Sequence, residues 1–173
     1  SYKLREDKLE ILSNKITNSE FKLNCITEIN PKDNTTLEGL YLSEGIYCTQ
    51  CEPEGFRKIT YFLDRPDVMT KFKVRIEGNY KFLLSNGNLI SQGQGWAEWN
   101  DPWPKPSYLF ALVAGNLKVI EDEFVSMTNK KILLQIFVEE GNEDKCQHAM
   151  DSIKKCMKWD EEIYNREYDL ERF

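Results

Sequence analysis

The chain has 173 residues, of which 40% are hydrophobic, and this is enough to build the core of one domain or of a domain plus part of another. The formal net charge is −6 at pH 7, which argues against nucleic acid or an anionic membrane as the main partner, because both require a basic face. No apolar run approaches the ~20 residues that a membrane-spanning helix needs. We therefore expect a folded protein that binds neither nucleic acid nor a membrane.

Alternating apolar and polar residues predict strands in the first part of the chain. Residues 21–29 alternate in this way and predict a half-buried strand, and residues 72–76 repeat the pattern. Apolar residues at 82–84 and 89–90 flank Asn86-Gly87, and Asn-Gly is the strongest short signal for a β-hairpin. We therefore expect a hairpin centred on this turn.

The middle of the chain combines a proline-rich connector with apolar runs. The prolines between residues 101 and 106 predict an extended, rigid connector. Residues 108–113 are apolar without interruption and predict a strand that is covered on both faces. Residues 119–125 and 132–138 predict a further pair of strands.

The spacing of the apolar residues changes after Gly141, where we expect a helix. Asn142 is the predicted N-cap, and acidic residues follow it in the first turn, where the helix dipole favours them. An apolar stripe at helical spacing then continues to about Trp159, and its members are Ala149, Met150, Ile153, Cys156 and Met157. The predicted fold class is therefore mainly β, ending in one helix.

Two motifs that could carry redox or metal chemistry also have a plain structural interpretation. Cys48 and Cys51 form a lone C-x-x-C, which could be a redox pair or half of a zinc site. We interpret them as buried thiols, because no second pair of ligands has matching spacing. His148 is the only histidine, so no two-histidine metal site is possible, and we interpret it as a surface or partly packed helix residue.

Carboxylates and tryptophans offer two further candidates. Paired carboxylates for acid–base chemistry could come from Glu38, Glu52 and Glu54, although only their distances would test this. A platform for a carbohydrate or a peptide could come from Trp96, Trp99 and Trp103. For the tryptophans we favour packing in the core, which is their commoner role.

Gln50 and Glu52 form the strongest candidate for a binding site. Residues two apart on an extended backbone point the same way, and Pro53 and Gly55 then force a turn. A carboxylate and an amide on one face of a turn can bind a small cationic group. The competing interpretation is that the polar pair only caps the turn.

Ordered blocks between residues 34 and 173 resemble the aminopeptidase N family of gluzincin zinc metallo-aminopeptidases, and its bacterial and parasite branch in particular. The blocks lie at residues 34–41, 47–57, 59–67, 82–88, 101–106, 108–115 and 157–162. Their common order and spacing make the combined match highly specific, whereas residues 1–33 fit by pattern only.

The resemblance implies a layout of two domains. Residues 1–115 would be the later part of an N-terminal β-domain, a saddle-like antiparallel β-sandwich. Residues 116–173 would supply the strands and the helix that open a thermolysin-like α+β catalytic domain. The family's zinc-binding His-Glu-x-x-His and its Gly-Ala-Met-Glu-Asn motif do not occur in this sequence. We therefore expect a fragment of an enzyme that lacks the zinc site and is inactive alone.

The resemblance also implies a role for the candidate pair. Glu52 falls on the family position that binds the free α-amine of the substrate, and Gln50 falls on the neighbouring position. The implied whole protein is a zinc-dependent protease, a hydrolase that removes N-terminal amino acids from peptides in peptide catabolism. Its partners would be a peptide with a free N-terminus and the remainder of the catalytic domain. The thiols and the family branch indicate the cytoplasm.

A second hypothesis is a stand-alone β-sandwich module that binds a partner and has no catalytic activity. It predicts a compact product of this length. Against it, the apolar face of the predicted helix at Ile153 and Met157 would have nothing to cover it.

Overall fold

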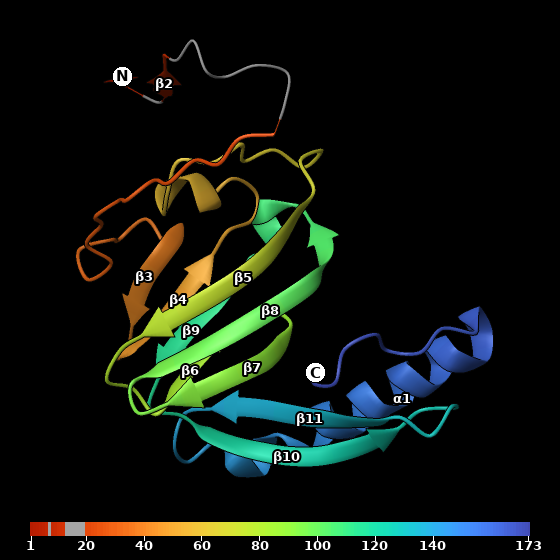
Figure 1. Cartoon of the computed structure of the whole chain (residues 1–173). Coiled ribbons are helices and arrows are strands. Elements are labelled where there is room, and N and C mark those ends of the chain that lie inside the picture. The colour runs from red at the N-terminus through yellow and green to blue at the C-terminus, as the bar shows by residue number, and fades with distance from the viewer. Residues whose placement is uncertain (7, 13–19) are drawn as a thin grey trace. The chain divides into compact units, whose positions relative to one another are not determined.

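The computed structural model describes residues 1–6, 8–12 and 20–173. These residues form two compact units, one made of residues 1–70 and 105–111 and the other of residues 71–104 and 112–173. Figure 1 labels the helix and most of the strands. Antiparallel strands dominate and a single α-helix follows them, so the predicted fold class is confirmed.

The first unit contains two short antiparallel hairpins and irregular segments. Strands β1 (Tyr2–Leu4) and β2 (Leu9–Ile11) form one hairpin, and β3 (Gly39–Ser43) and β4 (Ile46–Gln50) form the other. The β3–β4 turn has positive φ at both Glu44 (48°) and Gly45 (85°), which is the conformation of a type I′ hairpin turn. Two 3₁₀ turns, η1 (Phe56–Lys58) and η2 (Ser107–Leu109), complete the regular structure that is described in this unit.

The strand that we predicted over residues 21–29 is wrong. These residues are all described, and they form an exposed, irregular segment in which Phe21 is 63% exposed and Ile26 is 99% exposed. Alternation produces a half-buried strand only where another strand supplies hydrogen bonds and a covering layer, and this segment has neither. A side-chain bond holds it in place instead, since the Thr27 hydroxyl donates to the carbonyl oxygen of Ile59 at 3.0 Å.

The second unit contains a three-stranded sheet in the order β5-β8-β7 and the antiparallel strands β6 and β9, which pair with each other. The sheet consists of β5 (Thr70–Glu77), β7 (Asn88–Gly93) and β8 (Trp96–Lys105), and the pair consists of β6 (Phe82–Ser85) and β9 (Leu112–Gly115). Phe72 and Ile76 are buried on β5 while their neighbours are exposed, which confirms the strand predicted there. The proline-rich residues 101–105 continue β8, so the predicted extended conformation is also confirmed.

The hairpin predicted at Asn86-Gly87 is wrong in its pairing. The chain does turn there, with φ +86° at Gly87, but β6 pairs with β9 and β7 pairs with β8. The backbone of Asn100 on β8 lies so close that a Cβ atom on Gly87 would be 2.2 Å from its carbonyl oxygen. The turn therefore passes the chain from one sheet to another. The indole N–H of Trp99 links the two by donating to the carbonyl oxygen of Leu83 at 2.8 Å.

The continuous strand predicted over residues 108–113 is also wrong, because β9 begins only at Leu112. Residues 107–109 form η2 instead, and the following Phe110 packs edge-on against Phe56 with ring centroids 5.1 Å apart. An apolar run does not specify backbone conformation, and this one is covered only in part: Leu109 is 43% exposed, and Ala111 is also exposed.

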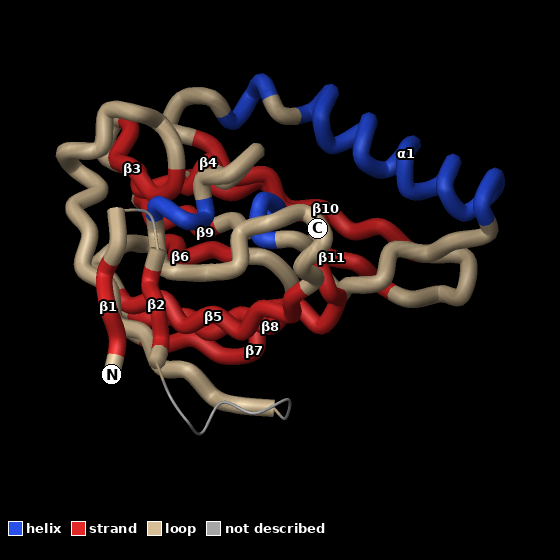
Figure 2. The backbone as a smooth tube through the Cα atoms, turned by 90° about the horizontal axis from the view of Figure 1, so that it is seen from above, coloured by secondary structure: helices blue, strands red, loops and turns tan. Residues whose placement is uncertain are grey.

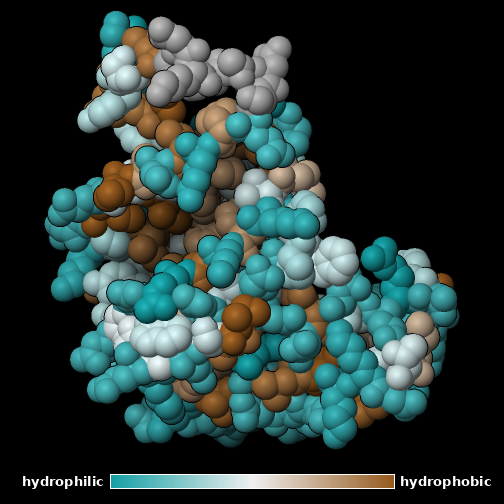
Figure 3. All heavy atoms as spheres, in the orientation of Figure 1, coloured by the Kyte–Doolittle hydropathy of each residue, from teal (hydrophilic) through white to brown (hydrophobic). Residues whose placement is uncertain are grey.

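A two-stranded hairpin and the helix form the rest of the second unit. Strands β10 (Lys118–Val125) and β11 (Lys131–Val138) pair over their full length, as predicted, and α1 (Gln147–Tyr164) lies along them in both Figure 1 and Figure 2. Buried Ile132 and Leu134 of β11 pack with Met150 and Met157 of α1. On the face that is visible in Figure 3, hydrophilic residues predominate over the two strands.

The helix differs in detail from its prediction. Asn142 makes no side-chain cap, because a 3₁₀ turn, η3 (Glu143–Lys145), intervenes and α1 is capped at Cys146. Two predicted members of the apolar stripe, Ala149 and Cys156, are exposed. The helix also continues five residues past Trp159, to Tyr164, and ends where Asn165 adopts the left-handed conformation with φ 52°. Within residues 1–6, 8–12 and 20–173, no helix is long and apolar enough to cross a membrane.

We predict that Ile132→Ala destabilises the second unit by about 2–5 kcal/mol, because the side chain is fully buried between β11 and α1. Urea unfolding followed by the far-ultraviolet circular dichroism of the helix measures the loss. Val125→Ala is the matched control on β10, where the side chain is 50% exposed and the expected change is below about 0.5 kcal/mol. Equal losses for the two variants would contradict this packing.

Candidate functional site

The predicted pair, Gln50 and Glu52, lies where strand β4 ends and a tight turn begins. Gln50 is the last residue of β4, and Glu52 is in the turn that follows. The Gln50 side-chain amide donates to the backbone carbonyl oxygen of Glu52 at 3.2 Å. Both residues are exposed, and the Glu52–Pro53 peptide bond is cis. The two residues therefore do lie together, although the extended backbone ends at Gln50 rather than continuing through Glu52.

The Glu52 carboxylate has no hydrogen bond or ion pair with any residue that the structure describes. Its neighbour Glu54 differs, because it forms an ion pair with Arg57 at 3.3 Å. The turn thus presents one unpaired acceptor to solvent, with the amide of Gln50 beside it. An exposed carboxylate in this state is available to a cationic ligand.

Close packing of the backbone fixes the shape of the turn. The Gly55 N–H donates to the Cys51 carbonyl oxygen at 2.7 Å, which closes the turn. A Cβ atom on Gly55 would lie 2.3 Å from the Gln50 carbonyl oxygen and 2.9 Å from the Cys51 Cα, so only glycine fits there. The next residue, Phe56, is buried and contacts Phe62 and Phe110 edge-on.

A buried carboxylate, Asp64, and its half-exposed partner Arg57 lie next to the turn. The Asp64 carboxylate accepts hydrogen bonds from the backbone N–H of Arg57 at 3.0 Å, from its Nε at 3.2 Å, and from the Ser107 hydroxyl. Arg57 Nη2 also donates to the Asp64 carbonyl oxygen at 2.8 Å. Neither Arg57 nor Asp64 was predicted from the sequence as part of a site. The available signal was an aspartate that follows directly on the apolar residues 61–63.

Cys51 belongs to the same buried region. Burial, together with the nearby charge of Asp64, raises the pKa of its thiol to about 11. The thiol therefore stays protonated at neutral pH, and the thiolate is the reactive form. All five cysteines are free, and Cys48 is only partly buried. The prediction of buried thiols is therefore confirmed for Cys51 and holds only in part for Cys48.

The other candidate residues do not assemble into a site. His148 is exposed on α1, and Glu38 is exposed without an ion pair in the described part of the chain. Trp99 is 3% exposed, whereas Trp96 is stacked beneath the Arg75 guanidinium at 4.3 Å. Residues three apart on one strand face opposite sides, so Trp96 and Trp99 cannot share a platform. Among the residues placed by the structure, no group of three or more His, Cys, Asp or Glu residues could hold a metal ion.

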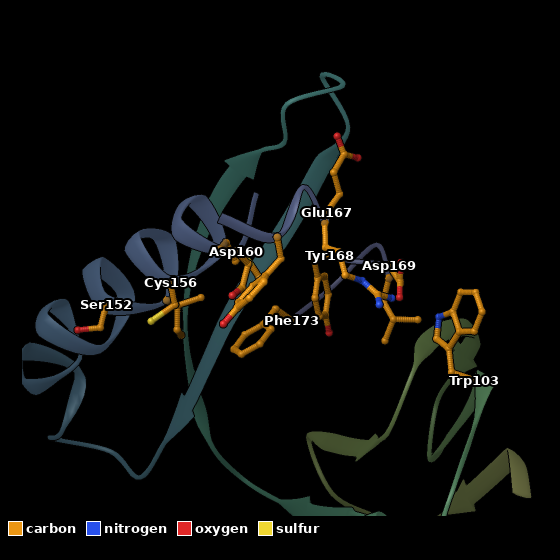
Figure 4. A pocket seen from close by; sticks show the side chains of 13 residues that line it. Trp103, Ser152, Cys156, Asp160, Glu167, Tyr168, Asp169 and Phe173 are labelled. Atoms are coloured by element: carbon orange, nitrogen blue, oxygen red, sulfur yellow. The ribbon is translucent and has the colours of Figure 1, made fainter. Parts of the chain in front are cut away.

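A cavity of about 540 Å³ lies in the second unit (Figure 4). Its walls come from α1, from the segment after it and from Trp103 of β8, and Figure 4 labels Asp160, Tyr168 and Phe173 among the lining side chains. The rings of Tyr168 and Phe173 contact each other edge-on at 5.4 Å. Apolar side chains and scattered polar side chains line this cavity. The polar side chains in this lining do not form a recognisable catalytic group.

A family model named "Peptidase M1 N-terminal domain" matches residues 3–109. The chain belongs to this family. An aminopeptidase N of Caulobacter vibrioides is 53% identical over 160 residues, which are 88% of this chain and 18% of that protein. The aminopeptidase N of Escherichia coli is 51% identical over 159 residues, which are 87% of this chain and 18% of that protein. The predicted resemblance is therefore confirmed.

Solved structures agree with this assignment to the M1 family. Legionella pneumophila aminopeptidase A in complex with aspartic acid matches 80% of this chain and 17% of its own, with a TM-score of 0.74 and 39% sequence identity. An M1 zinc metallopeptidase of Deinococcus radiodurans, bound to a Tyr-Ser-Ala substrate, has a TM-score of 0.66 over 79% of this chain and 33% of its own. At 17% identity the second match shows the fold alone.

We predict that Gly55→Ala destabilises the first unit by roughly 3 kcal/mol or more, because the new methyl group would overlap the Gln50 carbonyl oxygen. Gly45→Ala is the matched control: it meets no atom within 4 Å and should cost only about 1–2 kcal/mol, from its positive φ. Urea unfolding that is followed by amide exchange in the first unit measures both. A Gly55→Ala variant as stable as Gly45→Ala would contradict the close packing of the turn.

We also predict that iodoacetamide at pH 7.5 modifies exposed Cys25 and Cys156 in the native chain and leaves Cys51 unmodified. Cys51 is 3% exposed, and its thiol has a pKa of about 11. Mass spectrometry of peptides before and after denaturation measures the modification, and the denatured chain is the control in which every cysteine reacts. Rapid modification of native Cys51, or its ready oxidation with Cys48, would favour a redox role instead.

Proposed function

We propose that this chain is the substrate-anchoring part of a zinc-dependent aminopeptidase, in which Glu52 binds the α-amine of a peptide and Gln50 lines the adjacent subsite. One observation carries the proposal: Glu52 presents an exposed, unpaired carboxylate on a rigidly packed turn, with the Gln50 amide bonded to its backbone. The membership of the M1 family and the aminopeptidase N relatives support it.

The chemistry of the ligand suits this turn. A peptide α-amine has a pKa near 7.7–8.0, so at pH 7 it is mostly an ammonium group that donates up to three hydrogen bonds. A carboxylate that receives it makes a charge-assisted bond worth about 1.5–3 kcal/mol. Recognition of the free amine selects the end of a peptide over its interior, and this makes a peptidase an aminopeptidase.

The chain spans 18% of the length of the aminopeptidase N relatives that it matches. Its described residues do not fit a zinc site, because they contain no suitable cluster of ligands. We therefore assign the zinc and the bond-breaking chemistry to the remainder of the catalytic domain in a longer protein, and expect the 173 residues alone to be inactive. The substrate would be a peptide with a free N-terminus.

The domain boundary near residue 115 remains a prediction. The family model ends at residue 109, which supports the assignment of residues 1–115 to the N-terminal β-domain and of residues 116–173 to the start of the catalytic domain. A cytoplasmic location and a role in peptide catabolism are also part of the proposal. The location rests on the five cysteines, all of which are free thiols.

The experiment begins with the gene that encodes this chain, read beyond the codon for Phe173 and expressed as its complete product. We predict that Glu52→Ala raises KM for alanine p-nitroanilide about 10- to 100-fold, the factor that corresponds to one lost charge-assisted bond. The N-acetylated substrate should not be cleaved by either enzyme. Steady-state kinetics at pH 7 measures both effects.

Two controls complete this test. Glu28→Ala removes the same charge from an exposed position of the same unit and should leave KM within about twofold of wild type. Glu52→Gln keeps the shape of the side chain and removes its charge, so it should behave like Glu52→Ala. Equal KM values for the wild type and Glu52→Ala would remove Glu52 from the proposed site. A stop codon directly after Phe173 would instead favour a binding module.

A further inference from the structure

Asp64 is a buried carboxylate that joins three segments of the first unit. Its side chain is 3% exposed, and it lies in the irregular segment between η1 and β5. The donors to it come from Arg57 in η1 and from Ser107 in η2, which is 43 residues away in sequence. The bonds to this carboxylate therefore connect the three segments, beside the ring contacts of Phe56 with Phe62 and Phe110.

Arg57 extends the connection into the turn that carries Glu52. Its guanidinium contacts Asp64 with Nε and with Nη2, and the same Nη2 lies 3.3 Å from the Glu54 carboxylate. Arg57 therefore bridges an acidic residue of the turn and the buried carboxylate beneath it. Because a guanidinium is planar and carries donors in a fixed fork, these contacts also define its orientation.

The span between the two anchored ends of the turn is short. At one end Gln50 belongs to β4, where it pairs with Gly39 of β3. At the other end the backbone N–H of Arg57 is bonded to Asp64. Glu52 lies between these points, and the bond from Gly55 to Cys51 closes the loop around it. Fixing both ends therefore leaves the Glu52 backbone few alternative positions.

We propose that Asp64 is a positioning residue for amine recognition: through Arg57 it holds the turn so that the Glu52 carboxylate is preorganised for the substrate. This inference rests on the proposed function of Glu52. Preorganisation matters because a binding group that is already ordered loses less conformational entropy when the ligand arrives. Asp64 itself touches no substrate and acts only through the turn.

The test compares Asp64→Asn with Asp67→Asn in the complete gene product. The two aspartates lie in the same segment, and each is paired with an arginine. The Arg65–Asp67 pair is exposed, whereas the Asp64 side chain is buried. For Asp64→Asn we expect KM for alanine p-nitroanilide to rise about three- to tenfold with kcat within twofold of wild type. Asp67→Asn should leave both constants unchanged. A merely structural role would lower the active fraction, and hence kcat, without raising KM.

A second variant keeps the test decisive if Asp64→Asn does not fold. Arg57→Lys retains the positive charge and the aliphatic stem but loses the fork of donors, and the Arg57 side chain is 46% exposed. Arg57→Lys should raise KM for alanine p-nitroanilide, as Asp64→Asn does. In the 173-residue chain, amide exchange at residue 52 and at residues 54–57 should become at least fivefold faster in either variant, and exchange in β10 and β11 should not change.

The outcomes separate this inference from the proposed function. If Glu52→Ala raises KM but Asp64→Asn and Arg57→Lys do not, the positioning role is overturned and the anchor remains. If Glu52→Ala leaves KM unchanged, the anchor itself is wrong and the positioning role falls with it. A rise in KM for all three variants, with faster exchange confined to the turn, establishes the role.

Discussion

The first unit depends on one buried charge. Burying a carboxylate is costly unless donors replace the water that it loses, and Asp64 is supplied by two groups of Arg57 and by the Ser107 hydroxyl. Since these donors come from two separate 3₁₀ turns, η1 and η2, these turns and the segment of Asp64 can be arranged in only a few ways that leave the carboxylate satisfied. The packing of Phe56 against Phe62 and Phe110 then covers the same junction with apolar surface. The polar contacts of Asp64 and the apolar contacts of Phe56 thus specify how these segments are arranged, because no strand pairing joins them in the part of the chain that the structure describes.

The second unit is built on a different principle. Its hairpin, β10 and β11, pairs residue by residue over eight positions, and α1 covers it through buried aliphatic and methionine side chains. Such a core is stabilised by buried apolar surface and by the regular hydrogen bonds of the hairpin. Its free energy of unfolding is therefore spread over many contacts that each contribute little. The first unit has few ladders, and the loss of one buried ionic group affects several segments together.

This difference explains how much of the fold the sequence could predict. Local periodicity predicts strand β5, the pair β10 and β11, and helix α1. Each of these elements buries one face, so its apolar residues recur at the spacing of a strand or a helix. Residues 21–29 alternate equally well but are exposed, since alternation carries no information about whether a partner strand exists. Asn86-Gly87 correctly marks a turn, yet the partners of β6 and β7 lie elsewhere in the chain. The pairing of β6 with β9 brings Ser85 opposite Leu112, and a window of ten residues does not contain such a contact.

The candidate site divides in the same way. Gln50 and Glu52 could be selected from their spacing, the adjacent proline and glycine, and the family resemblance, all of which are local. The structural role of Asp64 could not be predicted from the sequence, because it depends on a hydrogen bond from Ser107, which is 43 residues away. Glu52 and Asp64 are both carboxylates with opposite environments, the first exposed and unpaired and the second buried and fully bonded. An unpaired group binds a cation more tightly when something else fixes its position, and the hydrogen-bonded carboxylate of Asp64 is well placed to do so.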